Sequence, residues 1–302
     1  MTLLLSIFAN DVLPIFLVAS VGFLLARYLH ADVKTLSRLA FNALAPCLVF
    51  NLLVTSKISA DEFGRMVLFA VCVVLGIGLI GRLITLPLRL DRATVSAFMI
   101  VVMFSNGGNY GLPVSLFAFG KDALARATIY FVTSSILTYT VGVFLASSGR
   151  KNTREALTGV LKVPVVYGVI AAAIVVATKT TLPAPVMRPI ELLSDAALPV
   201  MMLVLGMQLE RAAIPERPLL VVLATVLTLV VTPLLALGLA QVLGLSGTAR
   251  QAAVIEASMP TAVVTTILAL EYEIAPAFVT GVVFLSTLLS PFTVTLLIAH
   301  LK

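Results

Sequence analysis

Ten long apolar segments follow one another along this chain, separated by short polar stretches. A helix of about 20 residues crosses the hydrocarbon core of a bilayer. That length predicts spans at roughly 8–29, 35–54, 63–86, 93–119, 124–147, 161–178, 189–209, 218–243, 249–270 and 275–299. The composition agrees, because 60% of the residues are hydrophobic and 11% are charged, whereas soluble domains have about 45–50% and about 25%. The predicted fold class is an all-α polytopic membrane protein.

No polar insertion is long enough to form a soluble domain, so we expect a single transmembrane domain over 1–302. It divides into a first five-helix repeat at 1–148, a short cytoplasmic connector at 149–159 and a second five-helix repeat at 160–302. Arg27 is the first positive charge, so the first span lacks the basic start of a signal peptide and is predicted to be a retained helix.

Lysines and arginines are distributed unevenly between the two sides of the predicted bundle. The loops after odd-numbered spans contain twelve: Arg27, Lys34, Arg38, Arg82, Arg89, Arg92, Arg150, Lys151, Arg154, Lys162, Arg211 and Arg217. The other side has eight: Lys57, Arg65, Lys121, Arg126, Lys179, Arg188, Arg250 and Lys302. Basic loops stay in the cytoplasm, which predicts that both termini lie outside the cytoplasm.

Composition argues against several other functions. The net charge of +6 is explained by basic loops and does not indicate nucleic-acid binding. His30 and His300 stand alone, so neither a metal cluster nor a catalytic triad can be assembled, and Cys47 and Cys72 fit small core residues. Gly76-Ile77-Gly78 lacks the lysine of a phosphate loop. We therefore expect no enzyme activity, no cofactor and no ATP use.

The fourth predicted span is interrupted by a polar, helix-breaking run. Residues 105–113 read Ser-Asn-Gly-Gly-Asn-Tyr-Gly-Leu-Pro, and the nearest charges are Arg92 and Lys121. A helix broken in lipid leaves backbone N–H and C=O groups without partners, which is tolerated only where protein or a water-filled cavity satisfies them. The run therefore predicts a cavity near the centre of the bilayer.

The two halves of the chain match each other at a nearly constant separation. Residues 42–46 match 195–199 at a shift of 153, residues 134–137 match 286–289 at 152, and Pro14 matches Pro164 at 150. At the shift of 152, the first break falls on Ser258-Met259-Pro260 in span 9. Five spans per half reverse the second half in the membrane, so the pattern predicts an inverted repeat, as in many secondary transporters.

Crossing of spans 4 and 9 at their breaks would bring two half-helix N-termini together. Each such end carries about half a positive charge, which suits an anion, and neither span has a basic residue at its centre. The predicted substrate-binding residues are Asn106, Gly107, Gly108, Asn109, Gly111, Pro113, Ser258, Pro260, Thr261, Asn51 and Pro46. Capping by the asparagines, helix packing by the glycines and a simple proline kink in span 9 remain open alternatives.

Two acidic residues in the spans are candidates for ion coupling. Glu256 lies one helical turn before Pro260 among apolar neighbours, where an ionisable group is a functional candidate. It could bind a proton or supply oxygen ligands to sodium; the alternatives are a structural pair or a position nearer the interface. Asp195, four residues before Pro199, is the second candidate.

These motifs resemble the auxin efflux carrier family of membrane transporters, in its bacterial branch, over essentially the full chain. The resemblance rests on residues 105–113, on Ala-Ser-Met-Pro-Thr-Ala at 257–262 and on Phe-Leu-Ser-Thr-Leu-Leu-Ser at 284–290. It implies ten helices in two inverted repeats, the bile-acid–sodium symporter fold, a scaffold and a moving transport domain, broken helices 4 and 9 crossing at the substrate site, and a homodimer. The long central loop of plant members is absent here.

We therefore expect a secondary transporter in a bacterial cytoplasmic (inner) membrane. The resemblance implies a small organic anion as substrate, a mono- or dicarboxylate such as malate, malonate or an auxin-like acid. Coupling to protons, to sodium or to neither stays open. The alternative is a cation/proton exchanger on the same architecture. A sensor built on the fold is a further alternative.

Overall fold

The computed structural model describes residues 2–147, 161, 163–210 and 217–302. The predicted connector at 149–159 lies outside the described residues, as do five basic residues used for the orientation: Arg150, Lys151, Arg154, Lys162 and Arg211. Within the described ranges the chain is helical, with one isolated β-bridge and no strand.

The first half contains α1 (Thr2–Ile7), η1 (Phe8–Val12), α2 (Leu13–Leu29), α3 (Val33–Leu39), η2 (Ala40–Leu44), α4 (Ala45–Thr55), α5 (Ala60–Thr85), α6 (Arg92–Met103), η3 (Gly107–Gly111), α7 (Leu112–Phe119), α8 (Lys121–Leu137), η4 (Thr138–Gly142) and α9 (Val143–Ala146). The second half contains α11 (Pro164–Thr178), α12 (Ala184–Leu209), α13 (Pro218–Val226), η6 (Leu227–Val231), α14 (Thr232–Val242), α15 (Gly247–Ala257), α16 (Val264–Glu271) and α17 (Pro276–Leu301).

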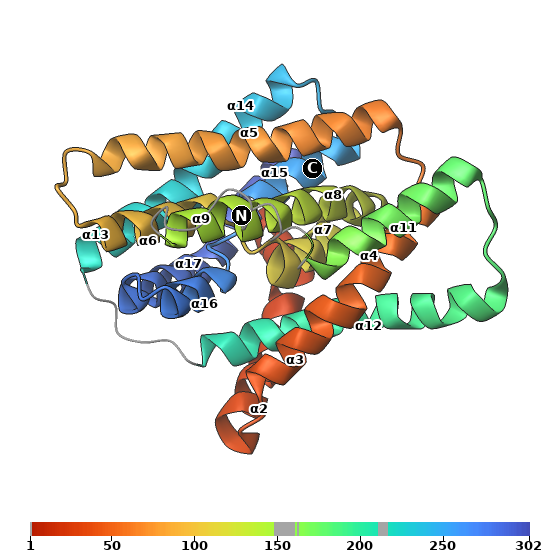
Figure 1. Cartoon of the computed structure of the whole chain (residues 1–302), viewed down its shortest axis with the longest axis horizontal. Coiled ribbons are helices and arrows are strands. Elements are labelled where there is room, and N and C mark those ends of the chain that lie inside the picture. The colour runs from red at the N-terminus through yellow and green to blue at the C-terminus, as the bar shows by residue number, and fades with distance from the viewer. Residues whose placement is uncertain (1, 148–160, 162, 211–216) are drawn as a thin grey trace.

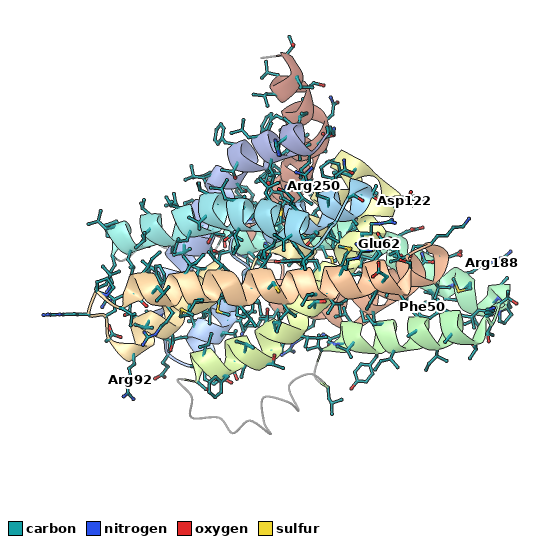
Figure 2. All side chains as sticks on the ribbon, turned by 90° about the horizontal axis from the view of Figure 1, so that it is seen from above. Phe50, Glu62, Arg92, Asp122, Arg188 and Arg250 are labelled. Carbon is teal, nitrogen blue, oxygen red and sulfur yellow. The ribbon has the colours of Figure 1, made fainter. Side chains whose placement is uncertain are left out.

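Among the described residues, seven helices are long and apolar enough to cross a membrane. They begin at Thr2, Val33, Ala60, Lys121, Ala184, Pro218 and Pro276. The other three predicted spans correspond to shorter pieces: α6 with α7, α11, and α15 with α16. Figure 2 places Arg92 at one end of the long helices and Arg188 at the opposite end.

Prolines shape many of these helices. Four of the five described π-helical segments, η1, η2, η3 and η6, end two residues before a proline. Proline lacks an N–H and its ring clashes with the carbonyl four residues earlier, so the ladder of hydrogen bonds is displaced. The residue before each proline bonds instead to the carbonyl five residues back: Leu13 to Phe8, Ala45 to Ala40, Leu112 to Gly107, and Thr232 to Leu227.

The helices form two groups, and each half of the chain contributes to both. One group packs α2, α3 and α4 against α11 and α12, which gather on one side in Figure 1. The other contains α5 to α9 and α13 to α17. An ion pair joins the two ends of the chain, because the Lys302 ammonium after α17 donates to the Asp11 carboxylate on η1 at 2.5 Å. Each group of helices is therefore built from both halves of the chain.

Helices α6 and α15 lie at the centre of the second group. Six consecutive residues at 98–103 and six at 252–257 are all buried. A helix buried on every side, with no exposed stripe, belongs to the interior of a bundle. The breaks that follow these two helices therefore lie deep inside the protein.

The two long helices α2 and α12 touch through their backbones. A Cβ added at Gly22 would overlap the Leu203 carbonyl, and one added at Gly206 would overlap the Ala19 carbonyl. Small residues of this kind allow membrane helices to approach closely and gain van der Waals contact. Glycine at both positions therefore sets the spacing within the first group.

We predict that Gly206→Ala lowers the thermal midpoint of the purified protein in detergent. The added methyl group must push α12 away from α2, and overpacking of this kind costs about 1–3 kcal/mol. Gly238→Ala is the matched control, because nothing lies within 4 Å of the added atom there. Equal midpoints for the two variants would contradict the close contact.

Candidate functional site

The first break separates α6 from the helix formed by η3 and α7. Helix α6 ends at Met103, and Phe104 has extended backbone angles of −112° and 108°. Helical structure resumes at Gly107, after Asn106, whose side chain makes no capping hydrogen bond. Residues 104–106 therefore separate α6 from η3 and α7, which continue to Phe119.

The second break crosses the first, and the two satisfy each other's backbone groups. Ser105 and Thr261 form an antiparallel bridge. The Asn106 N–H donates to the Pro260 carbonyl at 2.7 Å, and the Ala262 N–H donates to the Phe104 carbonyl at 2.8 Å. This two-residue pairing is what permits non-helical backbone at this depth.

Side chains strengthen the crossing. The Thr261 hydroxyl donates to the Val101 carbonyl at 2.8 Å, and the Ser105 hydroxyl donates to the Glu256 carbonyl at 3.0 Å. Each of these bonds satisfies a carbonyl near the end of α6 or α15, where intrahelical partners run out. Ser105 and Thr261 thus fix the two half-helices to each other.

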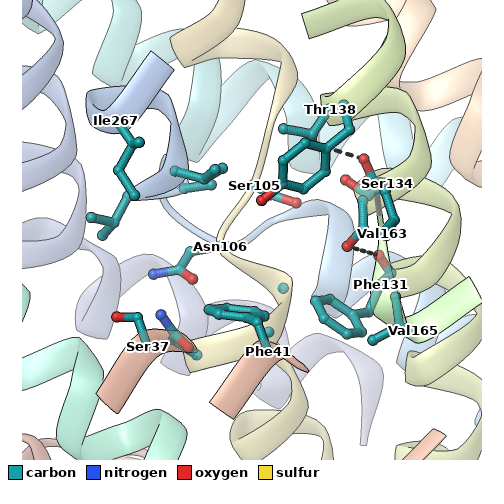
Figure 3. A pocket seen from close by; sticks show the side chains of 18 of the residues that line it. Ser37, Phe41, Ser105, Asn106, Phe131, Ser134, Thr138, Val163, Val165 and Ile267 are labelled. Atoms are coloured by element: carbon teal, nitrogen blue, oxygen red, sulfur yellow. Dashed lines mark hydrogen bonds between the residues drawn. The ribbon is translucent and has the colours of Figure 1, made fainter. Parts of the chain in front are cut away.

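A pocket of ≈140 Å³ lies beside this crossing, between the two helix groups. We call it the crossing pocket; Figure 3 shows Asn106 directed into it from the break, with Ser37, Phe41, Ser134 and Ile267 around it. None of the described residues that line it is charged. The described lining therefore offers a ligand apolar surface and hydrogen-bonding groups.

The starts of two half-helices face the crossing pocket. Gly107, Gly108 and Asn109 at the start of η3 line it, as do Val263 and Val264 at the start of α16. The first N–H groups of a helix have no intrahelical acceptor, and together they act as about half a positive charge. Two such ends border one pocket, an arrangement that favours an anion without a basic side chain.

Two asparagines leave polar groups unsatisfied at the crossing pocket. Asn106 is 5% exposed and its Nδ2 has no hydrogen-bond partner. Asn109 donates to Gln208 Oε1 at 3.3 Å, while its own Oδ1 has no partner. Buried polar atoms in proteins nearly always have partners, and an exception in a pocket calls for an explanation. A bound ligand would supply these partners.

Glu256 lies next to the crossing, near the end of α15, and it does not line the pocket. Its side chain is completely buried; Ser115 donates to Oε1 at 3.3 Å, and Oε2 has no partner. No ion pair within the described residues involves it. Its carboxyl group packs against the backbone of η3, because a Cβ built on Gly107 or on Gly111 would lie 2.6 Å from Oε2. The two glycines make room for this group.

The other predicted residues lie in three places. Pro260 and Thr261 belong to the crossing itself, and the Ser258 hydroxyl donates to the Val254 carbonyl of its own helix. Pro113 is buried in the first turn of α7. Asn51, Pro46 and Asp195 lie in the first helix group, outside the crossing pocket: Asn51 donates to Ser194 at 3.3 Å, the Pro46 backbone contacts Gly168, and Asp195 is exposed.

Several pocket residues were not among the predicted ones. Ser37 and Phe41 come from α3 and η2, Gln208 from the end of α12, and Ser134 and Thr138 from α8 and η4. The polar run at 134–138 in an otherwise apolar span was a signal that could have identified two of them. Nothing in the sequence marks Ser37 or Phe41, because only the packing of the two groups brings them to the pocket.

Seven long apolar helices among the described residues define a polytopic membrane protein, and it contains the crossing pocket. A sequence profile of the membrane transport protein family matches residues 7–157 and 148–298. The chain belongs to this family, which is that of the auxin efflux carriers.

Two archaeal proteins are similar to the chain over most of their length. A protein of Methanothermobacter thermautotrophicus is 28% identical over 263 residues, covering 86% of each chain. One of Methanocaldococcus jannaschii is 25% identical over 274 residues, covering 87% of this chain and 88% of its own. Both are described only as uncharacterized transporters. They are archaeal rather than bacterial, so the bacterial branch and a bacterial inner membrane stay predictions.

The packing of Gly111 against Glu256 leads to a double-mutant test. A Cβ at position 111 meets Glu256 atoms at 2.6, 2.7 and 2.8 Å as its three nearest neighbours. We predict that Gly111→Ala lowers the thermal midpoint by the equivalent of about 1–3 kcal/mol, and that adding Glu256→Ala restores part of this loss. Additive effects of the two substitutions would mean that they do not share this contact.

Proposed function

We propose that this chain is a secondary transporter that moves a small organic anion across the membrane by alternating access. The single observation that carries the proposal is the crossing pocket, at which two half-helix starts and the unpartnered Nδ2 of Asn106 meet without a charged side chain among the described lining residues. N–H donors at helix ends and an amide NH₂ together suit a carboxylate.

The size and position of the pocket narrow the substrate. A volume of ≈140 Å³ is smaller than the roughly 300–1,000 Å³ of sites for drug-sized ligands. It favours a short mono- or dicarboxylate such as malonate or malate over a bulkier auxin-like acid. Its place between two helix groups fits a mechanism in which one group moves past the other and carries the site with it.

The proposal includes the topology expected from the sequence. Ten segments cross the membrane as two inverted five-helix repeats, with the fourth and ninth broken at the crossing. Lys34, Arg38 and Arg92 lie on the cytoplasmic side and both termini on the other, as the count of basic residues suggests. The protein works in a lipid bilayer as a homodimer, which rests on the family resemblance alone.

Glu256 is the proposed coupling residue. An ionised carboxylate buried without a cation partner is costly, which suits Glu256 to take up and release a proton or a cation during transport. Because it packs against Gly107 and Gly111, a change in its charge acts directly on the helix start that faces the substrate. Asp195, exposed on α12, has no comparable contact with the site.

The unpartnered Glu256 Oε2 also favours a second function, a cation/proton exchanger. In that case a proton and a cation would compete at Glu256, and the crossing pocket would carry no organic anion. Uptake of labelled malonate, malate and indole-acetate into proteoliposomes, with and without imposed pH and sodium gradients, separates the two. Saturable uptake of an acid supports the carrier, whereas gradient-driven cation exchange without acid uptake supports the exchanger.

We predict that Asn106→Ala raises the KM for the transported acid by about 10- to 100-fold, since a hydrogen bond to a charged group contributes about 1.5–3 kcal/mol. Uptake kinetics in proteoliposomes measure this. Asn10→Ala is the control, because Asn10 is exposed and its amide group donates to Ser6, one turn earlier, away from the crossing pocket. An unchanged KM would remove Asn106 from the substrate site.

We predict that Glu256→Gln keeps the fold and abolishes the acceleration of uptake by a proton or sodium gradient. Glutamine has nearly the same shape and can accept the Ser115 hydrogen bond, but it cannot change charge. Uptake along the substrate's own gradient should persist. If the gradient still drives accumulation in this variant, coupling belongs to another residue.

A further inference from the structure

A second, larger cavity opens from the crossing pocket toward one end of the molecule. It has a volume of ≈700 Å³ and shares Ser37, Gln208, Val263 and Ile267 with the crossing pocket. We call it the vestibule. It runs between α3 and the end of α12 on one side and α16 and α17 on the other, so it follows the boundary between the two helix groups.

The vestibule contains three charged residues. Lys34 and Arg38 come from α3, and Glu271 comes from the end of α16. All three are exposed, and none takes part in an ion pair within the described part of the chain. By contrast, the charged groups of Arg27 and Glu210, at the ends of α2 and α12, form an ion pair at 3.3 Å. The described vestibule therefore has one more positive than negative charge, with both cations on the first helix group.

We infer that Lys34 and Arg38 form a capture site that draws the anionic substrate into the vestibule before it reaches Asn106. This inference rests on the proposed function, because it assumes that the cargo is an organic anion. Charged residues lining a cleft with low-dielectric walls raise the local concentration of an oppositely charged ligand. The crossing pocket has no charge of its own among its described residues, so long-range attraction must come from elsewhere.

Glu271 opposes the attraction that Lys34 and Arg38 exert on the anion. It faces the vestibule from the second helix group, opposite the two cations. Its negative charge weakens attraction of the anion, which keeps the capture site from holding the substrate so tightly that it does not move on. Removing this charge should therefore have an effect opposite to that of removing the cations.

The test is the kinetics of malonate and malate uptake into liposomes of zwitterionic lipid. We expect Lys34→Gln with Arg38→Gln to raise KM about tenfold at low salt, with the maximal rate within twofold of the wild type, and Glu271→Gln to lower KM. The difference in KM between each variant and the wild type should shrink as the salt concentration rises, because the Debye length falls from about 30 Å at 0.01 M to about 10 Å at 0.1 M. In vesicles that contain the protein in both orientations, the KM should change only for the molecules whose vestibule faces the added substrate.

The matched control is Arg89→Gln with Arg92→Gln. It removes the same charge from the same predicted side of the membrane, and neither residue lines the vestibule or the crossing pocket. An equal rise in KM in this control would overturn the capture site in favour of a general effect of net charge. So would an unchanged KM in the Lys34 and Arg38 double variant.

Three outcomes distinguish a lipid-headgroup site, a failure of the proposed function and a failure of the capture site alone. If the double variant differs from wild type only in liposomes with anionic lipid, Lys34 and Arg38 bind phospholipid headgroups and the capture site is wrong. If the wild type takes up neither acid while driving cation exchange, the proposed function fails and the capture site fails with it. Saturable wild-type uptake with unaltered variant KM overturns the capture site alone.

Discussion

The structure depends on two backbone hydrogen bonds that join residues 154 and 158 positions apart, Asn106 N–H to Pro260 C=O and Ala262 N–H to Phe104 C=O. An amide group in an apolar interior costs free energy when it has no hydrogen-bond partner. Each break alone would leave several backbone groups without one. Crossing the breaks lets each serve as the other's partner. Once the crossing forms, η3 and α16 have fixed starting points, and the pocket between them follows.

The same constraint explains why small and polar residues occupy the centre of an otherwise apolar protein. Gly107 and Gly111 leave space that the Glu256 carboxyl group fills, and Ser115 supplies its hydrogen bond. A larger side chain at either glycine would displace the carboxyl group from η3. The segment 106–111 therefore contacts both places, because Asn106, Gly107 and Gly108 line the crossing pocket while Gly107 and Gly111 pack against Glu256.

Local chemistry was the reason to expect a break in each of the two spans, and the internal repeat was the reason to expect that the two breaks meet. Gly107 and Gly108 weaken a helix by their conformational freedom and Pro113 removes a backbone donor, and the shift of 152 brings Asn106 onto Ser258, close to the Pro260 that it contacts. The walls of the pocket were not predictable in this way. Ser37, Phe41 and Gln208 reach the pocket only because two helix groups pack together, and one sequence contains no signal for that packing. For the same reason Asn51 and Asp195, which are polar residues in apolar spans, gave no indication that they lie away from the pocket.

The proline-associated π segments have a consequence for how relatives of this protein are compared. Each one inserts a residue into the helical repeat, and one residue corresponds to about 100° of rotation. In η2 and η6, the side chains after the proline are therefore turned around the helix relative to a straight continuation. A helical wheel drawn through the whole of such a span assigns the wrong face to half of it, and a relative that has lost the proline would present different residues to its neighbours from an identical downstream sequence.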